Sequence, residues 1–384
     1  MNTIGDHTLQ RGGSLTPSNY PDEVFELYSI PAHDRGGVDL VPGAEIGSSK
    51  QLVQPGDVLL SKIIPHIRRV RVVGSNSGHR QIASGEWIVL RTEAYDPSYL
   101  RHFLLSDGFH EQFMNTVAGV GGSLVRARPQ FVKQIPAPLP PVEEQRRIAA
   151  ILDQADAIRT KRRQVLAHLD ALPVSAFLSR FGDPDHATST ITLGEVARLS
   201  GGRNLVADDQ TQETSFRVLK ISAVTSGVFR ETESKWLPPG YVPPSAHLVR
   251  PGDLLMSRAN TAELVGATAL VGDASPNLAL PDKVWRFEWQ SPDTDPLFIQ
   301  TLLSVPSMRR RISRLASGTG GSMKNVSKEK LMRMPLPEVL AVEQHTFADS
   351  IRSAHRSRDL VAHTLDEDDA LFASLQARAF RGEV

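Results

Sequence analysis

A pair of acidic residues in the second half of the chain has the spacing of a metal-dependent nuclease site. Pro281-Asp282 is followed by Glu288-Trp289-Gln290, and two carboxylates so placed can hold a divalent cation that activates water. That chemistry also needs a lysine, and this chain has Gln290 in its place. We therefore expect no nuclease centre here.

Other catalytic patterns are also incomplete. Gly119, Gly121 and Gly122 suggest a cofactor loop, but they follow the helix-like segment FHEQFMNTVA, where a nucleotide-binding fold needs a strand. The sequence has no G-x-x-x-x-G-K-[ST] phosphate loop and no G-x-S-x-G nucleophile elbow. Zero cysteines exclude thiolate ligands and disulfides, and the 12 histidines form no H-x-x-x-H pair. We expect no catalytic, cofactor-binding or metal-binding residues in this chain.

Basic and amide side chains offer a different chemistry, the recognition of DNA. Arginine and lysine bind phosphates, whereas arginine, asparagine and glutamine read base edges. These residue types gather after the two segments PGDVLLS and PGDLLMS, and again after the glycine pairs Gly121-Gly122 and Gly320-Gly321. The predicted DNA contacts are Lys62, His66, Arg68, Arg69, Arg71, His79, Arg80, Ser123, Arg126 and Arg128 in the first half, and Arg258, Asn260, Thr261, Ser322, Lys324, Asn325 and Lys328 in the second.

The alternative for each of these residues is an ordinary solvated position. Arg309, Arg310, Arg311 and Arg314 leave the same choice open between phosphate contacts and a solvated helix face. The chain has 43 basic and 43 acidic residues, so any DNA-binding surface must be a local patch. Residues 1–135 contain 13 of each charge, and residues 190–334 contain 18 basic and 14 acidic. We expect weak DNA binding by the chain alone and tight binding with a partner.

The sequence repeats itself once. LVQPGDVLLS, at Leu52–Ser61, returns as LVRPGDLLMS at Leu248–Ser257. An offset of 199 residues also relates DPSYLRHFL to DPLFIQTLL, Glu144-Gln145 to Glu343-Gln344, and Phe181 to Phe380. Several ordered matches at nearly one spacing indicate two copies of one module.

Each copy begins with a mixed part and ends with a long helix. In the mixed part, Pro-Gly-Asp turns precede short apolar strands, and a helix is expected after Asp96-Pro97 and after Asp295-Pro296. From Val142 to Leu172 the chain has no glycine or proline, and acidic residues occupy the first turn, as the helix dipole favours. The predicted seam residues are Ile148, Ile151, Ala155, Ile158, Arg162, Val165, Leu169 and Leu172, then Phe347, Ile351, Ala354, Arg358, Val361, Leu365, Asp368, Phe372 and Leu375.

Two such helices are expected to pair with one another. The polar connector at residues 179–190 favours antiparallel pairing, with one mixed domain at each end of a pseudo-twofold rod. A helix of 32 residues would span about 48 Å. The charged seam residues Arg162, Arg358 and Asp368 either fix the register or extend to solvent at the edge. The predicted fold is α+β, with two mixed α/β domains separated by two long antiparallel coiled-coil helices and with boundaries 1–135, 136–178, 179–190, 191–334 and 335–384.

These features resemble the specificity (S) subunits of type I restriction-modification systems. LPPVEEQRRIAAILDQAD, at Leu139–Asp156, is similar to that family's central repeat region, and LFASLQARAFRGEV, at Leu371–Val384, is similar to its carboxyl end. The PGDVLLS and PGDLLMS segments are similar to a turn and strand of its target-recognition domains. The second joint, PLPEVLAVEQ, departs from the pattern because it lacks the double proline and double glutamate.

The resemblance implies a DNA-reading subunit without an active site of its own. Two target-recognition domains would each read half of a split DNA sequence, and the helices would measure the unread spacer. Two modification subunits that use S-adenosylmethionine to methylate adenine would dock on the chain, and two motor and restriction subunits would join them. The chain itself would hold no cofactor.

Two other functions stay open from the residues alone. A stand-alone DNA-modifying enzyme with a divergent active site would bind S-adenosylmethionine by itself, whereas a repeat adaptor that binds only protein would impose no DNA motif. We expect a cytoplasmic protein with no membrane partner. The reasons are the polar segment MNTIGDHTLQRGGS and the absence of an 18-residue apolar run.

Overall fold

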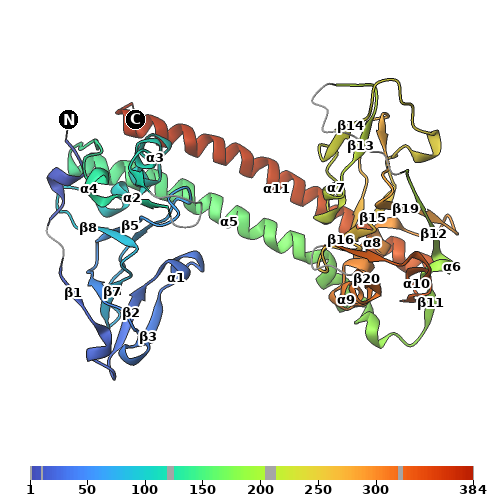
Figure 1. Cartoon of the computed structure of the whole chain (residues 1–384), viewed down its shortest axis with the longest axis horizontal. Coiled ribbons are helices and arrows are strands. Elements are labelled where there is room, and N and C mark those ends of the chain that lie inside the picture. Colours follow the sequence, from blue (N-terminus) through green and yellow to red (C-terminus); the bar gives the residue numbers. More distant parts are fainter. Residues whose placement is uncertain (1, 10–11, 119–124, 204–212, 319–322, 384) are drawn as a thin grey trace. The chain divides into compact units, whose positions relative to one another are not determined.

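The computed structural model describes residues 2–9, 12–118, 125–203, 213–318 and 323–383. Within it the chain divides into two compact units (Figure 1). Unit 1 combines Met1–Gln164 with Ala362–Val384, and unit 2 is Val165–Val361. The last segment of the chain therefore completes the unit that contains the first.

The described residues of unit 1 form three small sheets. The five-stranded sheet has the order β1 (Ser14–Leu15), β4 (Lys50–Leu52), β7 (Arg80–Ala83), β2 (Val24–Tyr28), β3 (Asp39–Pro42), and only β2 and β7 run parallel. The other sheets are antiparallel: β6 (Val70–Val72), β5 (Val58–Ser61), β8 (Trp87–Leu90), and the pair β10 (Arg126–Ala127) with β9 (Val117–Ala118).

Strand β5 is the centre of unit 1. The Pro-Gly-Asp turn before it needs the left-handed backbone of Gly56, at φ 89°. Val58 and Leu60 face a cluster that contains the helix α2 (Pro97–Leu105), and Leu59 faces a second cluster on the other side. Burial on both faces explains why the strand is apolar throughout.

Helix α2 packs against β5 and β6. α2 begins as predicted after Asp96, whose carboxylate accepts hydrogen bonds from the N–H groups of Ser98 and Tyr99. The other helices of unit 1 are α1 (Ile30–Asp34), α3 (Asp107–Met114), α4 (Pro129–Val132) and the 3-10 turns Gly5–His7, Pro17–Asn19 and Gly43–Glu45.

Unit 2 repeats this plan. Its central strand β15 (Leu254–Ser257) also follows a Pro-Gly-Asp turn, and α8 (Pro296–Ser304) begins after Asp295 in the same way as α2 after Asp96. The sheets are β12 (Ala197–Gly201)–β19 (Val284–Trp289)–β15–β17 (Thr268–Leu270), β14 (Ser234–Trp236)–β13 (Arg217–Leu219)–β18 (Leu278–Ala279), β16 (Ala259–Asn260)–β21 (Lys324–Val326)–β20 (Ala316–Ser317), and β11 (Thr190–Thr192)–β22 (Pro335–Pro337). The remaining short helices are α6 (Leu193–Val196), α7 (Ser222–Thr225), α9 (Pro306–Leu315), α10 (Lys328–Met332) and the 3-10 turns Pro184–His186 and Ser245–His247.

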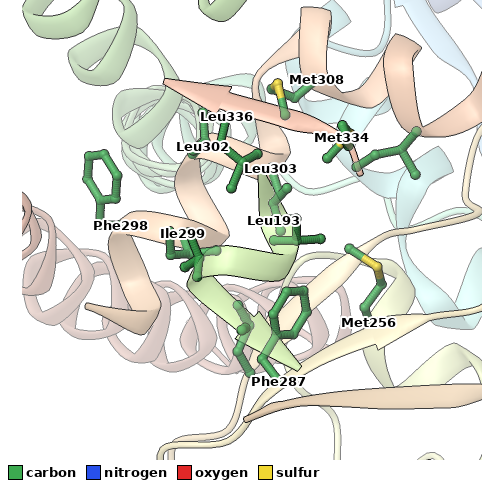
Figure 2. Packing of buried hydrophobic residues seen from close by; sticks show 14 of the residues in the cluster. Leu193, Met256, Phe287, Phe298, Ile299, Leu302, Leu303, Met308, Met334 and Leu336 are labelled. Carbon is green, nitrogen blue, oxygen red and sulfur yellow. The ribbon is translucent and has the colours of Figure 1, made fainter. Parts of the chain in front are cut away.

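The main core of unit 2 lies between β15, β19 and α8. Met256 and Phe287 approach it from the strands, and Leu302 and Leu303 approach it from the helix (Figure 2). The long helices add Phe177, Phe347, Ala348 and Ile351 to the same cluster. The helices are thus part of the domain core.

The two long helices are α5 (Val142–Phe181) and α11 (Ala341–Arg381). Helix α5 continues through Pro173, beyond the predicted stretch that ended at Leu172. In unit 1, Arg159 pairs with Asp369 at 2.5 Å, and residues 148–152 share a cluster with residues 372–380. In unit 2, Asp170 pairs with Arg358 at 2.7 Å, while Phe177 packs on Phe347. The segments are antiparallel in both units, which confirms the predicted pairing and the α+β class.

The predicted apolar seam is confirmed at its ends and at Leu365, which is 9% exposed. Ile148, Phe347 and Ile351 are buried, because they pack against the mixed domains as well as the facing helix. Ile158, Val165 and Leu172 are exposed, so the prediction of a continuous seam is wrong there. None of the helices in the described segments combines the length and apolar composition that crossing a lipid bilayer demands.

Candidate nucleic-acid interface

The two predicted DNA-contact loops of unit 1 lie side by side. The segment after β5 forms a bridge from Ile63 to Arg126, and the N–H of Ala127 donates to the carbonyl of Lys62 at 2.8 Å. The N–H of Ile64 donates to the carbonyl of Val125 at 3.2 Å. Loops more than 60 residues apart in the sequence therefore form one surface.

Unit 2 brings its own two loops together in the same way. In the β16–β21 pair, Ala259 faces Asn325 and Asn260 faces Lys324. The N–H of Val326 donates to the carbonyl of Arg258 at 3.0 Å, which is the counterpart of the bond between Ala127 and Lys62. The repeat thus extends to the backbone bonds of the candidate surface.

Three predicted arginines of unit 1 are held by carboxylates. Arg69 is only 8% exposed and makes a two-pronged pair with Asp34, at 2.6 and 2.8 Å. Arg126 binds the carboxylate of Glu86 at 3.0 and 3.1 Å, and Arg80 pairs with Glu23. The paired guanidinium groups lower the pKa of Glu86 and of Glu23. These charges are neutralised locally, which weakens their attraction for phosphate.

Three further arginines hold backbone carbonyls. Arg68 donates to the carbonyl of Leu105 at 3.1 Å and pairs with Asp107 at 2.6 Å. Arg128 donates to the carbonyl of Thr116 at 3.1 Å and stacks on Phe131 at 4.1 Å. Arg71 donates to the carbonyl of Gly36 at 3.4 Å.

Several predicted contacts keep their polar ends available. Within the described residues, no hydrogen bond or ion pair engages the side chains of Lys62, His66, His79, Arg258, Thr261, Lys324 or Asn325. Asn260 accepts a hydrogen bond from the N–H of Thr261 at 2.8 Å, and Lys328 donates to the carbonyl of Leu199 at 2.7 Å. Arg80 begins β7 of the five-stranded sheet, apart from the β5 sheet, and His79 directly precedes that strand. Ser123 and Ser322 lie outside the described residues.

The four arginines of α9 divide into two kinds. Arg309 reaches back to the carbonyls of Glu263 and Val265, at 3.0 and 2.8 Å, and burial lowers its pKa. Arg311 binds Asp185 and the carbonyl of Pro335. Arg310 and Arg314 are exposed. From the sequence, each of the four could be either a phosphate contact or a solvated residue. The anchoring role of Arg309 was missed because its partners are backbone carbonyl groups, which the sequence pattern does not reveal.

An open hollow of about 480 Å³ lies beside the candidate surface of unit 1. It is lined by Arg128, Pro129, Gln130 and Lys133. Its basic and amide lining suits a phosphate or a base edge. Among the described residues, no group of three or more histidine, aspartate or glutamate side chains could hold a metal ion.

Comparison with known proteins connects this geometry to a family. Residues 44–168 match the family model of the type I restriction modification DNA specificity domain. The chain therefore contains a region similar to that specificity domain. The matched region begins before β5, includes both candidate loops of unit 1 and ends within α5.

Individual members of the type I specificity family agree with the match. The specificity subunit of the type I restriction enzyme EcoEI from Escherichia coli is 33% identical over 124 residues, which are 32% of this chain and 21% of that protein. The EcoKI specificity subunit of Escherichia coli K12 is 26% identical over 311 residues, covering 74% of this chain and 65% of that protein. A solved chain of a type I R-M system shares the fold, with a TM-score of 0.59 at 19% identity over 100% of this chain and 97% of that one.

Proposed function

We propose that this chain is the DNA-reading subunit of a type I restriction-modification complex. Each unit would read one half of a two-part DNA target through the paired loops after β5 and β15. The observation that carries the proposal is the duplication of this loop pair, down to the bonds from Ala127 to Lys62 and from Val326 to Arg258. A surface built twice in one chain suits a target with two halves.

The chain's own side chains would supply recognition, and the chemistry would come from partners. S-adenosylmethionine would be bound by a modification subunit that methylates adenine, and motor and restriction subunits would join for cleavage. Because six of the seven predicted arginines are already paired with carboxylates or carbonyls, the lone chain would bind DNA weakly. Docking of the modification subunits would add the remaining contacts.

The proposal is tested by mapping methylated adenines in cells with and without the chain. A reproducible split motif that disappears with the chain is the expected result. A motif that persists in its absence, or methylation without sequence preference in its presence, would refute the proposal. Saturable binding of S-adenosylmethionine by the isolated chain would favour a stand-alone enzyme instead.

The long helices would set the distance between the two half-sites, because each of them contributes residues to both units. Four residues inserted into each helix would lengthen it by about 6 Å and rotate its end by about 40°. The expected result is a longer unread spacer with unchanged half-sites. A change in the half-site sequences would show that the helices do not act only by setting the spacer length.

A further inference from the structure

Each candidate surface carries an exposed aliphatic side chain at the same place. The turn after β5 closes with the N–H of Ile67 donating to the carbonyl of Ile64 at 3.0 Å, and the turn after β16 closes with Leu264 donating to Thr261 at 3.2 Å. Ile67 is 44% exposed and Leu264 is 41% exposed. The first and last residues of the two turns are both 197 residues apart, Ile64 from Thr261 and Ile67 from Leu264.

An arginine side chain holds each of the two turns in place. In unit 1, Arg68 ties the turn to the carbonyl of Leu105 and to the carboxylate of Asp107. In unit 2, the anchor comes from helix α9, where Arg309 holds the carbonyls of Glu263 and Val265. Two different arginines thus fix the same turn, so the exposed aliphatic residue has a defined position rather than a mobile one.

The turn of unit 1 is also strained. Ile64 has φ 49°, in the left-handed region that a β-branched residue rarely adopts. Its N–H bond to the carbonyl of Val125, together with the Ile63 bridge to Arg126, keeps it there. Strain of this kind is retained where a site needs a particular presentation of side chains.

The neighbours of these residues are polar groups suited to DNA. Lys62 and His66 precede Ile67, and Asn260 and Thr261 precede Leu264, with Lys324 paired opposite Asn260. In the major groove, the C5-methyl group of thymine is the apolar feature of a base edge, and aliphatic side chains contact it. An exposed aliphatic group amid phosphate and base-edge contacts therefore matches thymine.

We propose that Ile67 and Leu264 each contact a thymine methyl group, Ile67 in one half of the DNA target and Leu264 in the other. This inference rests on the proposed function and adds the base that each turn reads. Any half-site that contains a methylated adenine also contains its paired thymine, so the contact is available in both halves.

The test uses the full chain assembled with its modification subunits and duplexes that carry the mapped motif. All thymines of one half-site are replaced with deoxyuridine, which removes only the C5-methyl groups. Each lost methyl contact weakens binding about fourfold. The Ile67→Ala complex should show no uracil penalty in the half-site that Ile67 reads and an unchanged penalty in the other, and Leu264→Ala should show the reverse.

Matched controls are Leu40→Ala in unit 1 and Val242→Ala in unit 2, at aliphatic positions that are 58% and 69% exposed. Both control complexes should keep the uracil penalty in both half-sites. A penalty that persists at full size in Ile67→Ala and Leu264→Ala would overturn the inference while leaving the proposed function intact. Absence of any motif preference in the unmodified duplex would overturn the proposed function, and the inference with it.

Discussion

Arg162 of α5 pairs with Asp368 of α11, and its Nη1 also donates to the carbonyl of Thr364 at 3.1 Å. Arg162 and Asp368 each interrupt the apolar pattern of their own helix, and the two residues pair with one another across the helices. A single antiparallel register places them opposite one another. Of the two roles left open by the sequence, fixing the register is the one that this contact supports.

Removal of one partner should therefore cost more than removal of both. Asp368→Leu deprives the half-buried guanidinium of Arg162 of its carboxylate partner and should lower the free energy of unfolding by about 1 kcal/mol. The double variant Arg162→Leu/Asp368→Leu should recover that loss, because two apolar groups can pack across the helices. Thermal unfolding of the native chain, Arg162→Leu, Asp368→Leu and the double variant measures the coupling energy between the two residues. Simple additivity of the two single changes would contradict the pairing.

Gln145 should matter more for stability than its repeat counterpart Gln344. Gln145 is 1% exposed, accepts a hydrogen bond from the N–H of Asp96 at 2.8 Å, and donates to the carbonyls of Ala94 and Pro140 at 3.0 and 2.9 Å. Gln145→Ala leaves these buried groups unpaired and should lower the free energy of unfolding by about 2–4 kcal/mol. Gln344→Ala should cost less, since Gln344 is less buried and its bond to Asp295 is 3.3 Å. Denaturant unfolding compares them, and equal losses would refute the argument.

The buried His102 should make the stability depend on pH. Its Nε2 lies 2.7 Å from Oδ1 of Asp153, and burial lowers the pKa of His102 below its ordinary 6.5 even though this bond and the charge of Asp156 oppose the shift. The unfolded chain therefore binds the proton at a higher pH than the folded protein. This contribution is complete above about pH 6.5 and is lost as the pH falls through the lowered pKa.

The measurement is the melting temperature of His102→Gln between pH 7 and pH 5. The variant should lose less stability on acidification than the native chain, although burial also lowers the pKa of His33, His110 and His355. His363→Gln, at an exposed position, serves as the control and should follow the native curve. An identical pH profile for His102→Gln and the native chain would remove His102 from the account.

Lys62 and Arg69 should respond in opposite ways to substitution. Lys62 has no hydrogen bond or ion pair within the described residues, so Lys62→Ala should weaken DNA binding by the assembled complex, reduce the salt slope by about one, and leave the melting temperature unchanged. Arg69→Met should lower stability by about 1.5 kcal/mol through loss of the Asp34 pair and leave the salt slope unchanged. Filter binding across salt concentrations separates the two, and a reversed pattern would contradict the assignment.

The sequence repeat anticipated which residues occupy equivalent places. Phe380 packs on Tyr99 of α2 as Phe181 packs on Phe298 of α8, with ring centroids 5.4 and 5.5 Å apart. The predicted helices and the side-by-side candidate loops follow from the same repeat. Local patterns of this kind are carried by turn residues and hydrophobic spacing.

The state of individual arginines could not be predicted in this way. Arg69 and Arg80 are held by carboxylates 35 and 57 residues away in the sequence, and only the folded chain brings them together. The exposure of Ile158, Val165 and Leu172 was missed for a related reason, since burial at the ends of the seam depends on the mixed domains and not on the heptad alone. Tertiary contacts decided both outcomes.

Each unit is proposed to read its own half of the target, and methylation by a chain altered in one unit tests this most directly. Adenine methylation is to be mapped for a chain in which the unit 2 turn is altered by Arg258→Ala, Asn260→Ala and Thr261→Ala. The expected result is a motif in which one half becomes relaxed while the other half and the spacer stay as in the native chain. Loss of sequence preference in both halves, or an unchanged motif, would contradict it.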